Sequence, residues 1–360
     1  MSSSKVSPPS GSSSAAAMSK KLAAGIEFGL LHGVHAVLVS RDQRLILEHY
    51  DEGEDEDWGR PLGRVSFAPD TLHDLRSVTK SIVGLLYGCA LDRGLVPPPQ
   101  APLLALFPEY ADLAQDAARS RLTIEHALTM TMGLAWDETL PYTDPANSER
   151  AMEAAADRYG YALGQPFVEE PGARWIYSGG SAALVGAVIE RGVSKTLPEF
   201  AREALFEPLG ISAFEWAAGS DGVASAASGL RLRAGDLLRI GEMALGGGVW
   251  NGERIVSADW LQKSFQPAAE TGDGLGYGRL WFLGKASTPA LEGERQWIGG
   301  FGNGGQRLWL MPDAGLAMVI FSGNYNQWDA WITPSRVWRE IVLANLPPSA
   351  GIKPDNSSEI

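Results

Sequence analysis

The chain has only one cysteine, Cys89, in 360 residues. A single thiol excludes an internal disulfide and a zinc site built from several cysteine thiolates. Cys89 lies within the apolar run SIVGLLYGCAL, which is typical of a buried structural thiol rather than a reactive one. The sequence therefore predicts a fold without an internal disulfide or a zinc-thiolate site.

Basic residues are scarce, because 30 Lys and Arg stand against 43 Asp and Glu and give a formal net charge of -13. Such a chain repels phosphate backbones and anionic lipid surfaces, and no Lys/Arg-rich run offers a local exception. Long apolar runs are also missing: no segment reaches transmembrane length, and the N-terminal segment MSSSKVSPPSGSSSAAAMSKK lacks the apolar stretch of a secretory signal. The sequence predicts a cytoplasmic protein that binds neither nucleic acid nor membrane.

The sequence contains no Gly-x-Ser-x-Gly motif, the nucleophile elbow of α/β-hydrolases. It has five histidines, and His73 lies four residues before Ser77. The other four lie in apolar or helical runs that favour packing or surface roles: His32, His35, His49 and His126. These observations argue against a Ser-His catalytic triad.

Both ends of the chain are poor in large apolar residues. Residues 1–20 are mainly Ser, Pro and Ala, and residues 347–360 read PPSAGIKPDNSSEI. Such segments cannot bury enough apolar surface to offset the entropy of ordering, so we predict a disordered leader and a disordered tail.

The ordered part begins and ends with β-rich segments. Residues 21–33 are predicted to be helical, and HAVLVSRD and RLILEHYD form two predicted strands of a hairpin, followed by a solvated acidic loop from Asp51 to Asp57. Near the C-terminus, RLWLMP and AGLAMVIFSG are strand-like and DAWITPSRVWREIVLANL is helical. Residues 99–215 contain helical segments broken by Pro and Gly. We therefore predict one antiparallel sheet domain from residues 21–98 and 216–346, with residues 99–215 inserted as a helical lobe.

The strongest chemical signal is Ser77-Val78-Thr79-Lys80, at the start of the apolar helical run SIVGLLYGCALDRG. A spacing of three residues places both side chains on one face of a helix. A serine hydroxyl needs a neighbouring base, and a lysine can serve if its pKa is depressed. The same short motif also occurs at Ser2 to Lys5 in the predicted leader, so the helical context of Ser77 decides the assignment.

Two further segments fit the same chemistry. Tyr177-Ser178-Gly179 follows the turn PGARWI and precedes the helical run SAALVGAVIERG, which places a phenol on a loop where it can relay a proton. The glycine-rich run WIGGFGNGGQ, residues 297–306, enters a predicted strand. Glycines there allow a ligand to approach the backbone, whose N–H groups can complete an oxyanion hole.

Together these segments resemble the serine β-lactamase and penicillin-binding-protein superfamily, in the class C-like branch with family VIII carboxylesterases and 6-aminohexanoate-dimer hydrolases. The resemblance covers nearly the whole predicted ordered chain, through LRSVTKSIVGLL, LTIEHALTMTMGLAWDE, FVEEPGARWIYSGGSAALVG, LFEPLGISAFEW, SGLRLRAGDLLRIGEMALGGGVWNGERIV and GNGGQRLWLMP. It implies a β-lactamase/transpeptidase-like α/β fold, with an antiparallel sheet, flanking helices and an inserted helical lobe. It also implies that Ser77 is acylated, that Lys80 is its base partner and that Tyr177 corresponds to the tyrosine of Tyr-x-Asn.

The sequence departs from the family pattern at two motifs. Gly179 replaces the usual Asn, and Gly300-Phe301-Gly302 stands where Lys-Thr-Gly is expected. A phenylalanine between glycines cannot hold the carboxylate of an antibiotic, which argues against strong β-lactamase activity. The register is open, because residues 297–299 could be the equivalent segment. In the first register the Asn303 N–H joins that of Ser77 as oxyanion donor, and in the second the Gly300 N–H does so.

Several other residues are candidates for lining the substrate pocket. They are Trp136, Asp137, Tyr142, Gly179, Trp297, Phe301 and Gly302. Aromatic residues are more often core than contact, so these assignments depend on how the chain folds.

The predicted function is a serine hydrolase that forms an acyl-enzyme with a small ester or amide, as a carboxylesterase or a 6-aminohexanoate-oligomer hydrolase does. No cofactor or metal is implied, and the partner is a small-molecule substrate. A β-lactamase or D-Ala-D-Ala peptidase and a non-catalytic penicillin-binding-like scaffold are the alternatives. The sequence leaves the choice between monomer and homodimer open.

Overall fold

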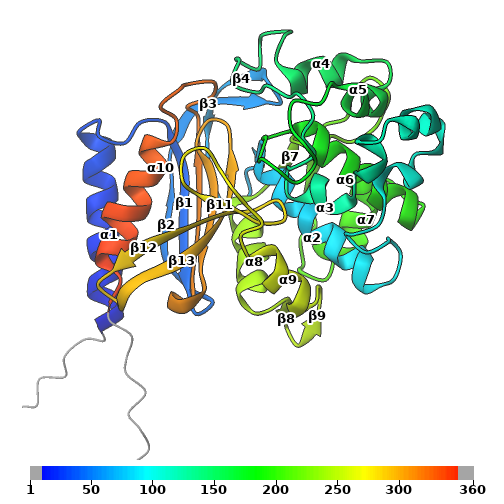
Figure 1. Cartoon of the computed structure of the whole chain (residues 1–360). Helices are drawn as coiled ribbons and strands as arrows, with labels where there is room; N and C mark the ends of the chain where they lie inside the picture. Colours follow the sequence, from blue (N-terminus) through cyan, green and yellow to red (C-terminus); the bar gives the residue numbers. More distant parts are fainter. Residues whose placement is uncertain (1–9, 348–360) are drawn as a thin grey trace, which may run out of the picture.

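The computed structural model describes residues 10–347 and arranges them in three layers (Figure 1). An eight-stranded sheet forms the middle layer, and helices α1 (Ser10–Glu27) and α10 (Ile332–Arg336) cover one of its faces. The α-helices on the other side are α2 (Val78–Asp92), α3 (Ile124–Leu128), α4 (Ser148–Ala154), α5 (Arg158–Gly164), α6 (Gly179–Val193), α7 (Leu197–Ala201), α8 (Ala234–Leu245) and α9 (Ala258–Ser264). Short 3-10 or π-helical segments are Leu103–Leu106, Pro108–Gln115, Arg119–Arg121, Arg202–Phe206, Pro312–Ala314, Val337–Val342 and Leu343–Asn345.

The main sheet is antiparallel, with the strand order β10-β11-β12-β13-β14-β15-β1-β2. Its strands are β1 (Val34–Arg41), β2 (Arg44–Tyr50), β10 (Ala269–Glu270), β11 (Gly276–Tyr277), β12 (Phe282–Thr288), β13 (Leu291–Gly302), β14 (Gln306–Met311) and β15 (Leu316–Ser322). β1 pairs with β15, so that Val37 lies opposite Ile320. The prediction of one antiparallel sheet built from both ends of the chain is confirmed.

Three small sheets surround the main one. The hairpin of β3 (Glu52–Asp57) and β4 (Arg60–Ser66) follows β2; β5 (His73–Asp74), β7 (Leu230–Leu232) and β6 (Glu215–Trp216) form a second sheet; and β8 (Val249–Trp250) pairs with β9 (Glu253–Arg254). β5 is short but important, because it leads directly into the turn that carries Ser77.

The central strands are buried on both faces, and alternate side chains enter different cores. In β1, Val37 and Val39 pack in the cluster that contains Met18 of α1. Ala36 and Leu38 pack in the larger cluster on the side of α2. Full burial of an aliphatic side chain stabilises the folded state by roughly 1.5–3 kcal/mol. The many buried side chains of these strands therefore stabilise the sheet against which α2 packs.

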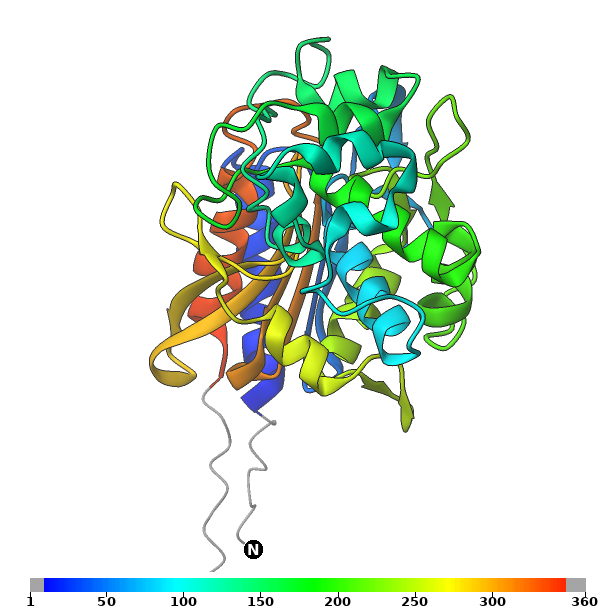
Figure 2. The same cartoon turned by 45° about the vertical axis from the view of Figure 1, so that its right-hand side comes forward.

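The middle of the chain is helical, as predicted. Between residues 99 and 214 the described elements are helices joined by loops, and Figure 2 shows them in front of the sheet. Their buried side chains share one apolar cluster with α2 and with Leu308 of the sheet. The division into a sheet domain and an inserted lobe at residues 98/99 and 215/216 stays a prediction.

The predictions for the N-terminal segment need correction. Residues 10–20 belong to helix α1 and not to a disordered leader, because Met18 and Leu22 are buried against the sheet. The helix ends at Glu27 rather than at residue 33, since Gly29 and Gly33 adopt left-handed conformations with φ of 65° and 62°. Residues 1–9 and 348–360 of the predicted leader and tail lie outside the described residues.

The prediction of a solvated loop from Asp51 to Asp57 is also wrong. These residues form strand β3 and pair with β4. Asp55 is only 2 % exposed, and its Oδ1 accepts a hydrogen bond from the Tyr325 hydroxyl at 2.8 Å. The acidic composition concealed one buried structural carboxylate among exposed ones.

Cys89 is buried on α2, and its thiol donates to the Ile255 carbonyl at 3.3 Å. Burial raises the pKa of this thiol to about 12, so the predicted structural role is confirmed. Across residues 10–347, no helix has both the length and the apolar character needed to cross a bilayer. The cytoplasmic location stays a prediction.

Candidate active site

Ser77 lies at the N-terminus of α2, after a strained turn. Arg76 has a left-handed backbone conformation with φ 48°, which is rare for a residue with a side chain and is often found at functional sites. The Asp74 carboxylate accepts a hydrogen bond from the Arg76 N–H at 2.8 Å, and Arg76 Nη2 donates to Glu56 at 2.7 Å. Although Ser77 is the N-cap residue, its hydroxyl makes no capping hydrogen bond, which leaves it free for other chemistry.

Lys80 lies one turn further along α2 and is only 1 % exposed. Its Nζ donates to Ser77 Oγ at 3.0 Å and to the Ala227 carbonyl at 2.9 Å, and it lies 3.5 Å from Glu149 Oε2. The structure therefore brings Ser77 and Lys80 together, as their helical spacing predicts.

These three acceptors favour the ammonium form of Lys80. Burial lowers its pKa, but attraction to Tyr177, Glu149 and Glu138 outweighs burial and raises the pKa above its ordinary value. The sequence argument required a depressed pKa for a lysine base. The resting site instead holds Lys80 protonated, so a proton relay here starts from an ammonium.

Tyr177 lies on the loop before α6, and Lys80 Nζ lies 4.9 Å from the centre of its ring. The next residue fixes this loop, because Ser178 Oγ caps α6 by accepting from the Ser181 N–H at 3.1 Å. Burial outweighs the attraction of Lys80 and the hydrogen bond with Ser77, so the pKa of Tyr177 lies above its ordinary value. Ser77, Lys80 and Tyr177 thus meet at one point.

Two carboxylates beside Lys80 were not singled out by the sequence analysis: Glu149, which is buried, and Glu138, which is half-buried. Glu149 accepts from Ser228 Oγ at 2.7 Å. Glu138 accepts from Trp136 Nε1 at 2.6 Å, from the Tyr142 hydroxyl at 2.9 Å and from the Gly179 N–H. Burial and the nearby Glu149 raise the pKa of Glu138 to about 7. Glu138 ends the segment LTIEHALTMTMGLAWDE, but nothing in that segment marks it as a neighbour of Lys80, and none of the segments that carry the resemblance contains Glu149.

The two carboxylates occupy the space next to Gly179, where the family has Asn. A Cβ atom on Gly179 would lie 2.8 Å from Glu149 Oε2 and 3.0 Å from Glu138 Oε1. Both distances are shorter than ordinary van der Waals contact. A side chain at position 179 would therefore displace the two carboxylates.

Ser77 opens onto two cavities. The first has a volume of about 320 Å³ and charged walls that include Arg76, Glu149 and Arg150. The second, of about 400 Å³, has aromatic walls. Its other lining residues include Tyr177, Gly302, Asn303 and Arg307. Two cavities that meet at Ser77 can hold the acyl part and the leaving group of one substrate, with the reacting bond at the serine.

Strand β13 forms the wall opposite the start of α2. A Cβ on Gly302 would lie 2.4 Å from the Leu75 carbonyl, just before Ser77, whereas a Cβ on Gly300 would meet Ser81, one turn further along α2. Asn303 lines both cavities with Ser77. Among residues 10–347, neither the Ser77 N–H nor the Asn303 N–H donates a hydrogen bond. The geometry thus favours the register 300–302, with Asn303 as the second oxyanion donor.

Comparison with known proteins decides the family. The family model described as Beta-lactamase matches residues 31–330. The chain belongs to the beta-lactamase family. It is 26% identical over 318 residues to 6-aminohexanoate-dimer hydrolase of Paenarthrobacter ureafaciens, covering 80% of this chain and 72% of that protein. It is 28% identical over 182 residues to esterase EstB of Burkholderia gladioli, covering 48% of this chain and 44% of that one.

The solved structures agree on the fold. EstCE1, described as a hydrolase with promiscuous acyltransferase activity, superposes with a TM-score of 0.70 at 18% identity, covering 92% of this chain and 97% of that one. These matches confirm the β-lactamase/transpeptidase-like fold and the class C-like branch of the beta-lactamase family. The chain is therefore a beta-lactamase-family serine hydrolase.

Only some of the other predicted pocket residues line a cavity that contains Ser77. Tyr142, Phe301 and Gly302 line the second cavity. Trp136 and Asp137 line a neighbouring hollow that touches Tyr177 but not Ser77. Trp297 is absent from the cavities around Ser77 and packs in the core on the α1 side of the sheet, because its position in β13 directs it there.

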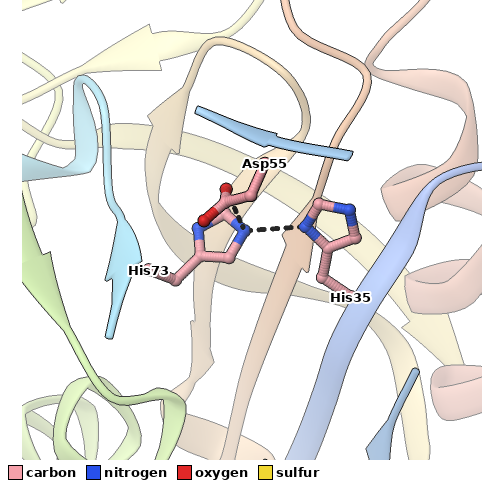
Figure 3. A group of neighbouring side chains, drawn as sticks. All are labelled: His35, Asp55 and His73. Atoms are coloured by element: carbon pink, nitrogen blue, oxygen red, sulfur yellow. Dashed lines mark hydrogen bonds and ion pairs between the residues drawn. The ribbon is translucent and has the colours of Figure 1, made fainter. Parts of the chain in front are cut away.

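His73, the rejected triad candidate, belongs to a buried cluster below the site. Figure 3 shows His35, Asp55 and His73 pointing toward one another. His35 Nδ1 and His73 Nε2 are hydrogen-bonded at 2.9 Å, and His73 Nδ1 donates to the Asp74 carbonyl at 3.0 Å. Burial lowers the pKa of each histidine to about 3.

His35, Asp55 and His73 are close enough together to hold a metal ion, and they are the group of this kind found among residues 10–347. Its ring nitrogens already bond to each other, and the Arg231 guanidinium lies 3.7 Å from Asp55. A positive neighbour disfavours a cation, so the donor set fits a structural network better than a metal centre.

Proposed function

We propose that this chain hydrolyses small esters and amides through an acyl-enzyme on Ser77, in the manner of a carboxylesterase or a 6-aminohexanoate-oligomer hydrolase. Ser77 attacks the carbonyl carbon, the N–H groups of Ser77 and Asn303 stabilise the oxyanion, and water releases the acyl group. The observation that carries the proposal is the 3.0 Å hydrogen bond from buried Lys80 Nζ to Ser77 Oγ beside two cavities.

Lys80 and Tyr177 move the serine proton in this mechanism. Because Lys80 rests as an ammonium, its charge stabilises negative charge on Ser77 Oγ and Tyr177 during attack. Tyr177 acts as the phenolate, which the Lys80 ammonium stabilises: it takes the proton of the Ser77 hydroxyl during attack and gives the same proton to the leaving group, so that it ends the step in the form in which it began. Glu138 and Glu149 balance the buried cation, and Glu138, with a pKa of about 7, can take up or release a proton near neutral pH.

The acyl group is expected to be uncharged or to carry an amino group, with short esters preferred to small linear or cyclic amides. The first cavity presents three acids (Glu56, Glu149 and Glu153) and two bases (Arg76 and Arg150), a balance that favours an uncharged or amino-bearing acyl group over an anionic one. Names of relatives support both bond types, since one is a dimer hydrolase and another an esterase. Penicillins or cephalosporins turning over faster than short p-nitrophenyl esters would contradict the ranking.

A β-lactamase or D-Ala-D-Ala peptidase is the first alternative, and Phe301 in place of the lysine-containing motif argues against it. A non-catalytic scaffold is the second alternative. A scaffold has no evident need for a buried lysine bonded to a free serine hydroxyl, so hydrolysis is preferred.

The proposal is tested by intact-protein mass spectrometry after incubation with a phosphonate ester probe. We expect one adduct per chain, located on the Ser77 peptide, together with turnover of p-nitrophenyl butyrate. Ser77→Ala is expected to remain unlabelled, and Ser81→Ala, a buried serine one turn along α2, to keep the label. An unmodified wild-type protein without turnover would favour the scaffold.

The space beside Gly179 gives a second test. Gly179→Ala is expected to lower kcat/KM for p-nitrophenyl butyrate roughly 10- to 100-fold, because the new Cβ displaces Glu138 and Glu149 from Lys80. Gly235→Ala is the matched control, since Gly235 is also in the first turn of a helix and a Cβ there meets nothing within 4 Å. Equal kcat/KM values for the two variants would show that the carboxylates tolerate displacement.

A further inference from the structure

The turn of hairpin β3–β4 is strained at an aromatic residue. Asp57 pairs with Arg60, so Trp58 and Gly59 form a two-residue turn, and both have a positive φ, of 47° and 85°. Such turns favour Asn followed by Gly, and a bulky side chain rarely adopts this conformation. Backbone strain of this kind persists only where the surrounding contacts hold the residue in place, and it is concentrated at sites that bind ligands.

Trp58 is held by two hydrogen bonds to segments that surround the nucleophile. Its backbone N–H donates to Asp74 Oδ2 at 2.8 Å, and its indole Nε1 donates to Ser228 Oγ at 2.9 Å. Both acceptors are buried. Because Asp74 also accepts from the Arg76 N–H, one carboxylate fixes both the turn before Ser77 and the tip of the hairpin.

The indole contact continues to Lys80. Ser228 Oγ in turn donates to Glu149 Oε1 at 2.7 Å, and Glu149 Oε2 lies 3.5 Å from Lys80 Nζ. Ser228 is only 5 % exposed, so water cannot readily replace it as the acceptor of the indole N–H. The Trp58 side chain is therefore fixed both at its backbone and at its ring.

Trp58 has the largest side chain in the wall of the first cavity. It lines that cavity together with Gly59, Ser77 and Ser228, and Figure 1 shows its hairpin close to α4, which supplies Glu149 to the same wall. The cavity has a volume of about 320 Å³. Forcing extra methylene groups against a well-packed wall costs free energy, so a fixed indole sets an upper limit on the group that enters.

The position of Tyr177 decides which part of the substrate meets this limit. Of the two cavities that contain Ser77, only the second contains Tyr177. The group that gives a proton to the leaving atom must lie beside the leaving group. The leaving alcohol or amine therefore enters the second cavity, and the acyl group enters the first, beside Trp58.

We propose that Trp58 is a specificity-determining residue that limits the length of the acyl group, so that short acyl chains are accepted and long ones are excluded. This inference rests on the proposed function. The strained turn and the two hydrogen bonds have a common purpose in it, because a ring that is held in place can exclude a longer chain, whereas a mobile ring would move aside.

The test compares p-nitrophenyl octanoate with p-nitrophenyl butyrate, which share the leaving group and differ in acyl length. The wild type is expected to prefer butyrate roughly tenfold or more in kcat/KM. Trp58→Asn removes the ring and suits the left-handed turn, and it is expected to reduce this preference at least roughly tenfold. Trp58→Phe keeps an aromatic ring and is expected to stay closer to the wild type. Trp331→Asn, which removes an exposed indole outside both cavities, should keep the wild-type ratio.

An unchanged ratio in Trp58→Asn, or a wild type without preference for butyrate, would overturn the inference while ester turnover still supports hydrolysis. If neither ester is hydrolysed, the proposed function fails, and binding of octanamide measured by calorimetry decides about Trp58 alone. Binding at least roughly tenfold tighter in Trp58→Asn than in the wild type supports a limit on length, and equal binding contradicts it. The ratio of two substrates is unaffected by a smaller fraction of folded protein.

Discussion

Lys80→Met is expected to lower kcat/KM for p-nitrophenyl butyrate by roughly 10³- to 10⁵-fold, nearly as much as Ser77→Ala. Methionine keeps the length of the side chain but removes the amine that donates to Ser77 Oγ and to the Ala227 carbonyl. It also removes the cation that stabilises negative charge on Ser77 and Tyr177. Steady-state rates of the two single variants and of the double variant measure the effect.

The double variant separates a shared role from two independent ones. Residues that act as a unit show non-additive losses, so Ser77→Ala/Lys80→Met should be no slower than Ser77→Ala alone. Lys263→Met is the control, since Lys263 forms an exposed ion pair with Asp259 on α9. A Lys80→Met variant that keeps more than a tenth of the wild-type kcat/KM would exclude Lys80 from the proton relay.

Asp55→Ala is expected to lower the free energy of unfolding by roughly 2–4 kcal/mol. The change leaves the Tyr325 hydroxyl without its acceptor and removes the carboxylate that lies 3.7 Å from both His73 Nε2 and Arg231 Nη2. All these groups are buried, so water cannot readily replace the lost partner. Unfolding in urea, followed by tryptophan fluorescence, gives the measurement.

Asp57→Ala is the matched control for Asp55→Ala. Asp57 lies on the same strand and 3.8 Å from Arg231, but its side chain is partly exposed, and it also pairs with exposed Arg60. Exposed ion pairs contribute about 0–1 kcal/mol, so this variant should unfold close to the wild-type midpoint. Equal midpoints for the two variants would mean that the buried cluster has no special role. If Asp55→Ala does not fold, Asp55→Asn, which keeps the size of the side chain, takes its place.

The fold could be predicted where local patterns and chain order agree. Strands β1, β2, β14 and β15 stand out by their composition, and α2 by its apolar spacing. The N-terminal helix was predicted only over its second part; residues 10–20 were missed because their buried anchor, Met18, does not stand out among Ser and Ala. Strand β3 was missed because its exposed acids concealed buried Asp55.

The arrangement of the candidate catalytic residues was predictable in part, for a physical reason. Ser77 and Lys80 lie one helical turn apart, so their contact is local and can be read from spacing. Tyr177 could be placed on a loop from the sequence, but its role rested on its place in the set of motifs and on the resemblance to a family. Glu138 and Glu149 come within reach of Lys80 only when the helical middle packs on α2, and no local pattern records that contact.

The sequence by itself determined the family and the local pairing of Ser77 with Lys80, because these depend on order along the chain. Only the tertiary structure decided the charge of Lys80 and placed Glu138 and Glu149 beside it. Each depends on burial and on partners distant in sequence, and the energy of a charge is set by its surroundings rather than by its own residue type.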